Sequence, residues 1–269
     1  MVAISKVKQN QYILHELVRK SVKTQYRNSW LGMLWTILNP LLNMLVMWIV
    51  FSQFFGKNDP VYPIYLLTGN ILFSALRGAT MGGMTSVAGN RGLLLRTKID
   101  TELFPLASTL SSLVTFGFAF LALTVIMLFM QLFGGYNLFG FQILFVILML
   151  PAFVLFEYGI SLFLSAIYIF ARDIQHLYSV FLTLWTYLTP IFYKIESLQV
   201  GSFAYEAVKL NPMYYFVRYF RDAVYNYNYL GWSMPYMKTL GLLYLIGIGT
   251  FGIGYVIFRL LKNKFMTNI

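Results

Sequence analysis

The interval between Glu102 and Glu157 contains no charged side chain, and this feature limits most strongly what the chain can fold into. A helix crosses the hydrocarbon core of a bilayer with about 20 apolar residues, so the interval is too long for one helix. The residues GGYN at 134–137 supply a break within it. Only 11% of the chain is charged, against about 25% in soluble domains. We therefore predict an all-α polytopic membrane protein.

Six segments are long and apolar enough to cross a membrane: residues 31–55, 62–87, 103–133, 141–170, 174–193 and 239–258. With the N-terminus inside, the cytoplasmic segments hold thirteen of the 20 Lys and Arg residues and the outer segments hold six, while Arg77 falls within a span. Cytoplasmic loops carry the excess of basic residues in multi-pass proteins. The pattern predicts six transmembrane helices with both termini in the cytoplasm.

The N-terminal segment, residues 10–29, is predicted to form an amphipathic helix. At helical periodicity its charged side chains share one face and its apolar side chains fill the opposite face. The charged face holds Glu16, Arg19, Lys20, Lys23 and Arg27, and the apolar face holds Ile13, Leu14, Leu17, Val18 and Val22. Such a helix lies in the inner-leaflet interface and is attracted to anionic membrane lipid. The alternative is a helix docked on a partner through the same apolar face.

Residues 91–102 form the sizeable cytoplasmic loop between predicted spans. Its charges are of both signs, and Arg96 with Asp100 and Lys98 with Glu102 stand at the i,i+4 spacing of helical ion pairs. A short helix here could dock on a cytoplasmic subunit. The alternative is a solvated connector.

Residues 195–238 are predicted to form short extracytoplasmic re-entrant helices. Asn211 followed by Pro212 is a favourable helix start, with Asn as N-cap and Pro at the first helical position. The helix that follows is amphipathic, aromatic-rich and too charged to span. Tyr and Trp are typical of the headgroup region, so we expect this helix to dip into the outer leaflet.

Arg172 and Asp173 lie between two long apolar runs, in the predicted hairpin between the fourth and fifth spans. Asp173 falls in the first turn of the fifth span, where the helix dipole favours an anion, and Arg172 anchors the inner surface. A topological anchor is sufficient to explain both charges.

Arg77 and Glu157 are the ionisable residues within predicted spans. Each costs about 3 kcal/mol at mid-span unless it is paired. One hypothesis is that they pair with each other. The alternative is that each is satisfied separately by its own neighbours.

Polar and aromatic stripes suggest which faces line a path through the membrane. Trp35, Asn39 and Asn43 recur on one face of the first span. In the fifth span Tyr178, Trp185 and Thr189 share a face, with Tyr193 near its outer end. Such faces pack through hydrogen bonds or line a channel, and a charge-free aromatic lining suits a neutral, hydroxylated cargo. The alternative is ordinary core or lipid-facing aromatics.

The sequence lacks the motifs of several common binding and catalytic sites. No GxxxxGK[ST] phosphate loop occurs, so the chain does not bind ATP in that way. With no cysteine and two distant histidines, His15 and His176, no metal site is expected. We predict no catalytic residue, no cofactor on this chain and no nucleic-acid partner.

Three stretches are recognisable together: YRNSWLGMLWTILNPLLNMLVMWIVFS at 26–52, ARDIQHLYSVFLTLWTYLTPIFY at 171–193 and NPMYYFVRYFRD at 211–222. Through them the chain resembles the membrane (permease) subunits of ABC-2-type polysaccharide exporters, which carry O-antigen, teichoic acid or other cell-wall glycans. The resemblance runs through nearly the full length. It implies a bacterial cytoplasmic (inner) membrane protein that pairs as a homodimer with two cytoplasmic ATPase subunits, which bind the ATP and Mg.

The resemblance also implies roles for particular residues. The loop with Arg96, Lys98, Asp100 and Glu102 matches the helix that couples to the ATPase. Arg172 and Asp173 fall near the cytoplasmic mouth, where the pyrophosphate of a polyprenyl-pyrophosphate-linked polysaccharide would enter. The outer helices match an extracytoplasmic gate, with candidate residues Pro212, Tyr214, Tyr215, Arg218 and Arg221. ATP binding would push the coupling loops, part spans one and five at the dimer axis, and thread the polymer processively.

Two other functions stay open from the sequence. One is ABC-2 export of a small amphiphile such as a drug or a lipo-oligosaccharide. The other is a membrane-embedded lipid-glycan transferase, which needs clustered carboxylates or a His at the membrane surface to activate a nucleophile. No such cluster is visible in the sequence.

Overall fold

The computed structural model describes residues 2–25, 32–35, 38–39, 41–43, 45–46, 49–50, 61–97, 99–135, 140–224, 234–262 and 264–265. Among these residues every regular element is helical and none is a strand. Within the described ranges, three helices are long and apolar enough to cross a membrane: Leu103–Phe133, Gln142–Tyr168 and Met237–Lys262. The prediction of an all-α, multi-pass membrane protein is confirmed at this level. Most of the predicted span at 31–55 lies outside the described residues.

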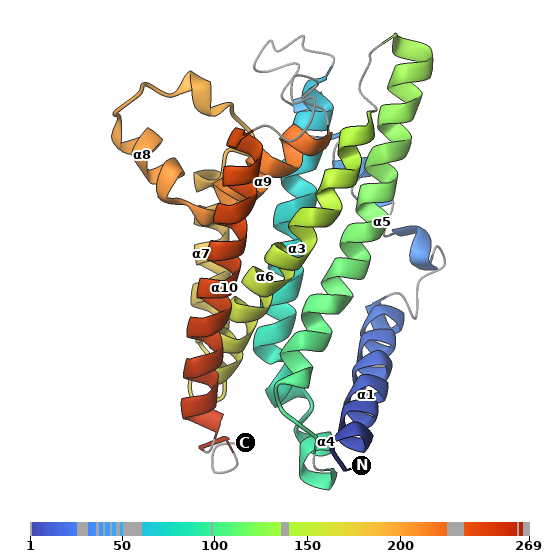
Figure 1. The fold of residues 1–269 in the computed structure, drawn as a ribbon, viewed down its shortest axis with the longest axis vertical. Helices are drawn as coiled ribbons and strands as arrows, with labels where there is room; N and C mark the ends of the chain where they lie inside the picture. Colours follow the sequence, from blue (N-terminus) through green and yellow to red (C-terminus); the bar gives the residue numbers. More distant parts are fainter. Residues whose placement is uncertain are drawn as a thin grey trace.

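Four long helices run side by side along the long axis of the molecule (Figure 1). They are α3 (Tyr62–Gly89), α5 (Leu103–Gly134), α6 (Val146–Tyr168) and α10 (Met234–Lys262). A short 3-10 turn, η2 (Phe141–Phe145), leads into α6. Most side chains of α3 are buried, so it forms the centre of the bundle. These helices correspond to the predicted spans at 62–87, 103–133, 141–170 and 239–258.

The helix α7 (Ile174–Leu188) is shorter than the span predicted at 174–193. Thr189 is extended, with φ −81° and ψ 131°. The residue before a proline is pushed out of the helical region by the proline ring, and Pro190 follows Thr189. The prediction of a helix to Tyr193 is therefore wrong at its outer end, where residues 189–193 continue as non-helical chain.

Glycines allow α6 and α10 to approach closely. A methyl group added at Gly159 would meet the backbone of Thr250 and Phe251 at 2.5 Å. One added at Gly254 would meet the carbonyl oxygen of Gly159, and one at Gly247 that of Ala152. Small residues at such crossings are how helices associate in lipid, where the hydrophobic effect does not drive them together.

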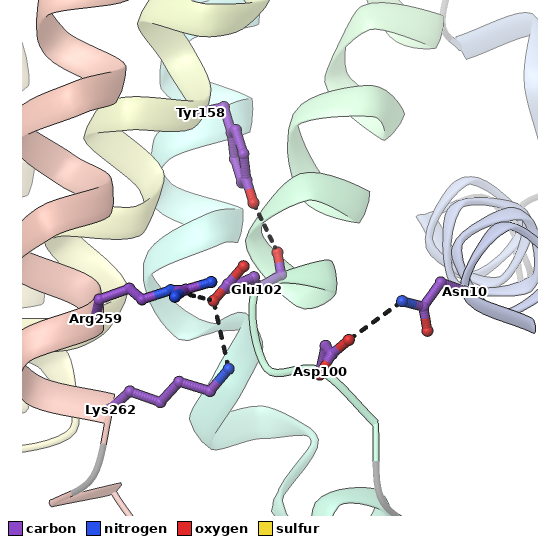
Figure 2. Close-up of polar contacts among 6 residues, drawn as sticks. All are labelled: Asn10, Asp100, Glu102, Tyr158, Arg259 and Lys262. Atoms are coloured by element: carbon purple, nitrogen blue, oxygen red, sulfur yellow. Dashed lines mark hydrogen bonds and ion pairs between the residues drawn. The ribbon is translucent and has the colours of Figure 1, made fainter. Parts of the chain in front are cut away.

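The short helices lie at the two ends of the bundle (Figure 1). One end holds the start of α1 (Val2–Gln25), α4 (Arg91–Arg96) and the last turn of α10, and the other end holds α8 (Phe203–Leu210) and α9 (Pro212–Val224). In Figure 2, α1 is seen nearly end-on while α5 and α10 are seen from the side, so α1 runs across the bundle. A helix at the predicted N-terminal position is confirmed; its place in the lipid interface stays a prediction.

Candidate functional site

The side chain of Arg221 joins α9 to both α3 and the end of α7. It is 7% exposed. Its Nη1 donates to the carbonyl oxygen of Pro190 at 2.6 Å, and its Nη2 to those of Tyr65 at 3.1 Å and Ile191 at 3.2 Å. Its Nε reaches Oγ1 of Thr68 at 3.4 Å, and the guanidinium lies 3.5 Å from the centre of the Tyr65 ring. Carbonyls left without helical partners where α7 ends are thus satisfied by a charged donor.

Tyrosines of α3 hold the same non-helical segment. The hydroxyl of Tyr62 donates to the carbonyl oxygen of Phe192 at 2.7 Å, and that of Tyr65 contacts the carbonyl oxygen of Pro190 at 3.1 Å. The predicted lining residue Tyr193 folds back, and its hydroxyl donates to the carbonyl oxygen of Tyr187 at 3.2 Å. The segment is therefore fixed from α3, α7 and α9 together.

Asn211 is the second junction between α7 and α9. Its Oδ1 accepts from Nε1 of Trp185 at 2.7 Å and from the backbone N of Met213 at 3.0 Å. Its Nδ2 donates to Oγ1 of Thr189 at 3.0 Å. The predicted helix start at Asn211 and Pro212 is confirmed, because the bond to Met213 is an N-cap bond and α9 begins at Pro212.

The remaining candidate gate residues lie along α9, where Tyr214 is buried, Pro212 and Tyr215 are partly buried and Arg218 is exposed. The rings of Tyr214 and Tyr215 meet edge to face, with centroids 5.0 Å apart. Nη1 of Arg218 donates to the hydroxyl of Tyr214 at 3.2 Å, and its Nε lies 4.0 Å from the Asp222 carboxylate. The short helices of the predicted outer region exist as α8 and α9, while residues 225–233 lie outside the described part. The gating role stays a prediction.

The predicted coupling loop begins with α4, whose Leu93 and Leu95 are 37% and 62% exposed. The helix ends at Arg96, and Thr97 is extended, with φ −139° and ψ 143°. The i,i+4 pairing predicted for Arg96 with Asp100 needs a helix through both residues, so that interpretation is wrong. Lys98, predicted to pair with Glu102, lies outside the described residues.

Asp100 and Glu102 instead tie the loop to three helices (Figure 2). Oδ2 of Asp100 accepts from Nδ2 of Asn10 in α1 at 3.2 Å. Oε1 of Glu102 lies 3.3 Å from Nζ of Lys262 and 3.6 Å from Nε of Arg259, both in the last turn of α10. The carbonyl oxygen of Glu102 accepts from the hydroxyl of Tyr158 in α6 at 3.2 Å. The base of α5 is thereby connected to α1, α6 and α10.

Arg172 and Asp173 are both exposed, in the tight connection between α6 and α7. Asp173 directly precedes α7 rather than lying in its first turn, as was predicted, and its side chain makes no capping hydrogen bond. Its contribution at this helix end is therefore through its charge and its backbone carbonyl, which accepts from the backbone N of His176 at 3.0 Å.

Arg77 and Glu157 do not pair with each other. Nη2 of Arg77 reaches Oγ1 of Thr186 at 3.4 Å. Glu157 is completely buried, and within the described part of the chain neither of its carboxyl oxygens has a hydrogen-bond partner. The hypothesis of an intramembrane ion pair is therefore wrong.

The stripe predicted to line a path in α7 lies on the buried face of that helix. Tyr178, Trp185 and Thr189 are at most 8% exposed. The opposite face is exposed and apolar or aromatic: Leu177, Val180, Phe181, Leu184 and Tyr187. The other predicted stripe, Trp35, Asn39 and Asn43, lines a cavity of about 770 Å³ together with α1, α3 and α5. The two stripes do not meet in one site, and a role in lining the channel stays a prediction for both.

Comparison with protein families identifies the family to which most of the sequence belongs. Residues 13–225, from within α1 to the end of α9, match the family described as ABC-2 type transporter. This stretch includes the candidate coupling loop, α7 and the outer helices. The chain belongs to the ABC-2 type transporter family.

Curated relatives within this ABC-2 family agree over most of the chain. The O-antigen export system permease protein RfbA of Myxococcus xanthus is 29% identical over 201 residues, which are 75% of each chain. Two proteins of the same name from Klebsiella pneumoniae are each 26% identical, over 254 and 262 residues, covering 94% of this chain and 93% of theirs. The resemblance to ABC-2 permeases predicted from the sequence is confirmed.

Some contacts of this ABC-2 permease were missed from the sequence. The acceptors of Arg221 are mainly backbone carbonyls, which have no sequence signature. The basic partners of the Glu102 carboxylate, Arg259 and Lys262, lie in α10, about 160 positions distant in the chain. The one signal that was available is the recurrence of Asn70, Ser74, Gly78 and Gly82 at helical spacing along α3, which face the cavity beside the first span.

Proposed function

We propose that the chain is the membrane subunit of an ATP-driven exporter that moves a lipid-linked polysaccharide across the bacterial cytoplasmic membrane. The observation that carries the proposal is the similarity to O-antigen export permeases over 94% of the chain. The chain itself is non-catalytic in this proposal, because its sequence contains no phosphate-binding loop. The ATPase, with its ATP and Mg, is then a separate cytoplasmic subunit.

The ATPase docks at α4 in this proposal. Exposed Leu93 and Leu95 offer apolar contacts, and Arg91 and Arg96 flank them with positive charge. Movement of α4 reaches the spanning helices through Asp100 and Glu102, which contact α1, α6 and α10 (Figure 2). A push on the loop is thus transmitted to the bundle rather than absorbed in a flexible connector.

Two copies meet near the exposed face of α7. That face presents Leu177, Leu184 and Tyr187, which are between 60% and 68% exposed. A channel at the homodimer axis between α7 and the first span would expose this face to the cargo. Tyr178, Trp185 and Thr189 would reach the cargo only if α7 moved away from α3, α6 and α9. Polymers too long to be enclosed would then be threaded processively.

The lipid phosphate of the cargo meets Arg172 at the cytoplasmic mouth. Arg172 is exposed beside the start of α7, and a guanidinium forms strong paired hydrogen bonds with phosphate. At the other end, α8 and α9 form the outer gate, held by Arg221 and Asn211. Opening of that gate has to disturb the contacts of the segment that follows α7.

Co-purification tests the assignment. The chain, carrying the only tag, is produced with candidate ATPase subunits and extracted gently in detergent. We expect a stable complex with equal amounts of a subunit that has a phosphate-binding loop, and we expect scrambling of residues 96–102 to abolish it. As a matched control, scrambling the exposed outer segment 196–202 should leave the complex intact. A chain that purifies alone under the same conditions contradicts the proposal.

A further inference from the structure

A cavity of about 770 Å³ lies within one protomer, away from α7. Its walls come from α1, the first span, α3 and α5. On α3 the lining residues run from Asn70 to Asn90, a stretch of helix about 30 Å long at the α-helical rise. The cavity therefore follows much of the thickness of a bilayer.

The walls of the cavity carry many uncharged polar side chains among apolar ones. Each of the four segments contributes uncharged polar side chains, and among the described residues Lys20 of α1 is the one ionisable member of the lining. The uncharged polar members include Ser21, Thr24, Asn39, Asn43, Asn70, Ser74, Thr85, Ser86, Asn90, Ser108, Ser111, Ser112 and Thr115. Phe104, Phe116 and Trp35 add aromatic surface. Amides and hydroxyls beside aromatic faces are the groups that bind a sugar ring through its hydroxyl and C–H groups.

Part of this polar lining is left without protein partners. Several hydroxyl groups are used within their own helices, as where Oγ of Ser111 donates to the carbonyl oxygen of Ala107 at 2.7 Å. In the part of the chain that the structure describes, the side chains of Asn39, Asn43, Asn70, Ser74 and Ser108 make no hydrogen bond. Polar groups at membrane depth are costly unless they are satisfied, and acyl chains offer neither donors nor acceptors. The cavity calls for an occupant that brings its own hydrogen-bonding groups.

We propose that this cavity binds the neutral, hydroxylated part of a glycan within each protomer, separately from the channel at the dimer axis. The glycan hydroxyls replace water at the unpartnered amides, and Lys20 meets a phosphate group at the end of the cavity next to α1. This inference rests on the proposed function, because it takes the cargo to be a polysaccharide. It adds a second place where the polymer contacts the chain.

Cysteine labelling tests the proposal directly, because the chain has no native cysteine. Ser74→Cys and Ser108→Cys place a nearly isosteric thiol on the α3 and α5 walls, and Leu121→Cys places one on the exposed apolar side of α5. Each variant is assembled with its ATPase in cells that make the polymer and in cells that lack the glycosyltransferase for its first sugar. The probe is a membrane-impermeant, cationic methanethiosulfonate, which reacts with the thiolate.

We expect both cavity cysteines to react in cells without polymer and to react at least about tenfold more slowly when polymer is present. Leu121→Cys should stay unreactive in both, because an apolar environment suppresses the thiolate. Cavity cysteines as unreactive as Leu121→Cys indicate a cavity filled by lipid and overturn the proposal. Equal reaction with and without polymer indicates a water-filled cavity that does not hold glycan, and overturns it as well.

A substitution that fills the cavity provides a second test, with surface polymer as the measurement. Gly82 lines the cavity, and a methyl group added there has Ser108 as its neighbour at 3.6 Å, so Gly82→Leu can extend into the open space. Gly249 of α10 is exposed, with nothing within 4 Å of an added methyl group, so Gly249→Leu is the matched control. We expect Gly82→Leu to lower surface polymer severalfold at equal protein level and Gly249→Leu to leave it unchanged. Equal export by the two variants contradicts the proposal.

Failure of this proposal is distinguishable from failure of the proposed function. Cells deleted for the chain are first complemented with the unaltered gene, and surface polymer is measured. If complementation does not restore surface polymer, the proposed function is wrong and the cavity proposal falls with it. If it does, the labelling result decides on the cavity alone.

Discussion

At the residue scale, Arg221 is unusual in placing a guanidinium among backbone carbonyls of two other segments. A lysine keeps the charge but cannot reach Pro190, Ile191 and Tyr65 from one planar fork. Hydrogen bonds from a charged group contribute about 1.5–3 kcal/mol each, so we expect Arg221→Lys to lower the free energy of unfolding by about 2 kcal/mol. Thermal unfolding in detergent measures the change.

Arg218→Lys, a change on the same helix α9, is the control for this prediction. Its guanidinium is half exposed and 4.0 Å from Asp222. Exposed ion pairs contribute under about 1 kcal/mol, so its substitution should change stability little. If the two lysine variants unfold alike, Arg221 does not hold the segment after α7.

Substitution of Arg172 distinguishes a topological anchor from a residue that binds the lipid phosphate. If it meets the lipid phosphate, Arg172→Gln should lower export severalfold, because a neutral amide loses the charge-assisted hydrogen bonds. Membrane insertion and ATPase binding should be unchanged. Surface polymer is compared at matched protein level, with Arg96→Gln as a variant expected to fail in ATPase binding instead. Unchanged export by Arg172→Gln leaves only the anchor.

The contacts of a residue were predictable from the sequence where neighbours in the chain determine them. They were less predictable where backbone distant in the sequence determines them. Asn211 and Pro212 start a helix because capping depends on neighbours in the chain. Arg77 and Glu157 were open to pairing because both are costly in lipid, yet their placement on α3 and α6 directs them to different surroundings. The partners of Arg221 depend on where α7 ends, which no spacing of charges predicts.

At the scale of elements, a matched pair of substitutions tests the close glycine contact between α6 and α10. An added methyl group at Gly254 meets the backbone of Gly159, whereas at Gly252 it meets nothing within 4 Å. Overpacking costs about 1–3 kcal/mol, so we expect Gly254→Ala to be destabilising by that amount. Gly252→Ala should be neutral or slightly stabilising, because alanine favours the helix. Equal melting temperatures would show that the two helices separate easily.

The observed helix boundaries agree closely with the predicted ones wherever the length of an apolar run determines them. The helix α5 begins at Leu103, as predicted from the last charge before it. The exceptions are α4, which stops at Arg96, and α7, which stops at Leu188. In both cases a long apolar or charge pattern continued past the point where the backbone leaves the helix. Hydropathy predicts which residues can lie in lipid, not whether their backbone is helical.

At the scale of the whole molecule, the exposed face of α7 predicts where two copies would meet in the proposed homodimer. Leu184 is 60% exposed on α7, and Leu245 is 69% exposed on α10. In the otherwise cysteine-free chain we expect Leu184→Cys to form a cross-linked dimer with a short bifunctional reagent in native membranes. Leu245→Cys, on a lipid-facing helix in the proposed dimer, should remain monomeric. Cross-linking through Leu245→Cys alone would place the dimer axis at α10.

The early end of α7 also has a consequence for the surrounding bilayer. Fifteen helical residues measure about 22 Å, against about 30 Å of hydrocarbon. Lipid beside this helix has to thin, or the side chains that hold residues 189–193 have to meet acyl chains. Hydrophobic mismatch of this kind makes the barrier to a polar polymer lowest next to α7. We expect export in reconstituted vesicles to fall as acyl chains lengthen, and export that is indifferent to chain length would show that the partner copy shields this helix from lipid.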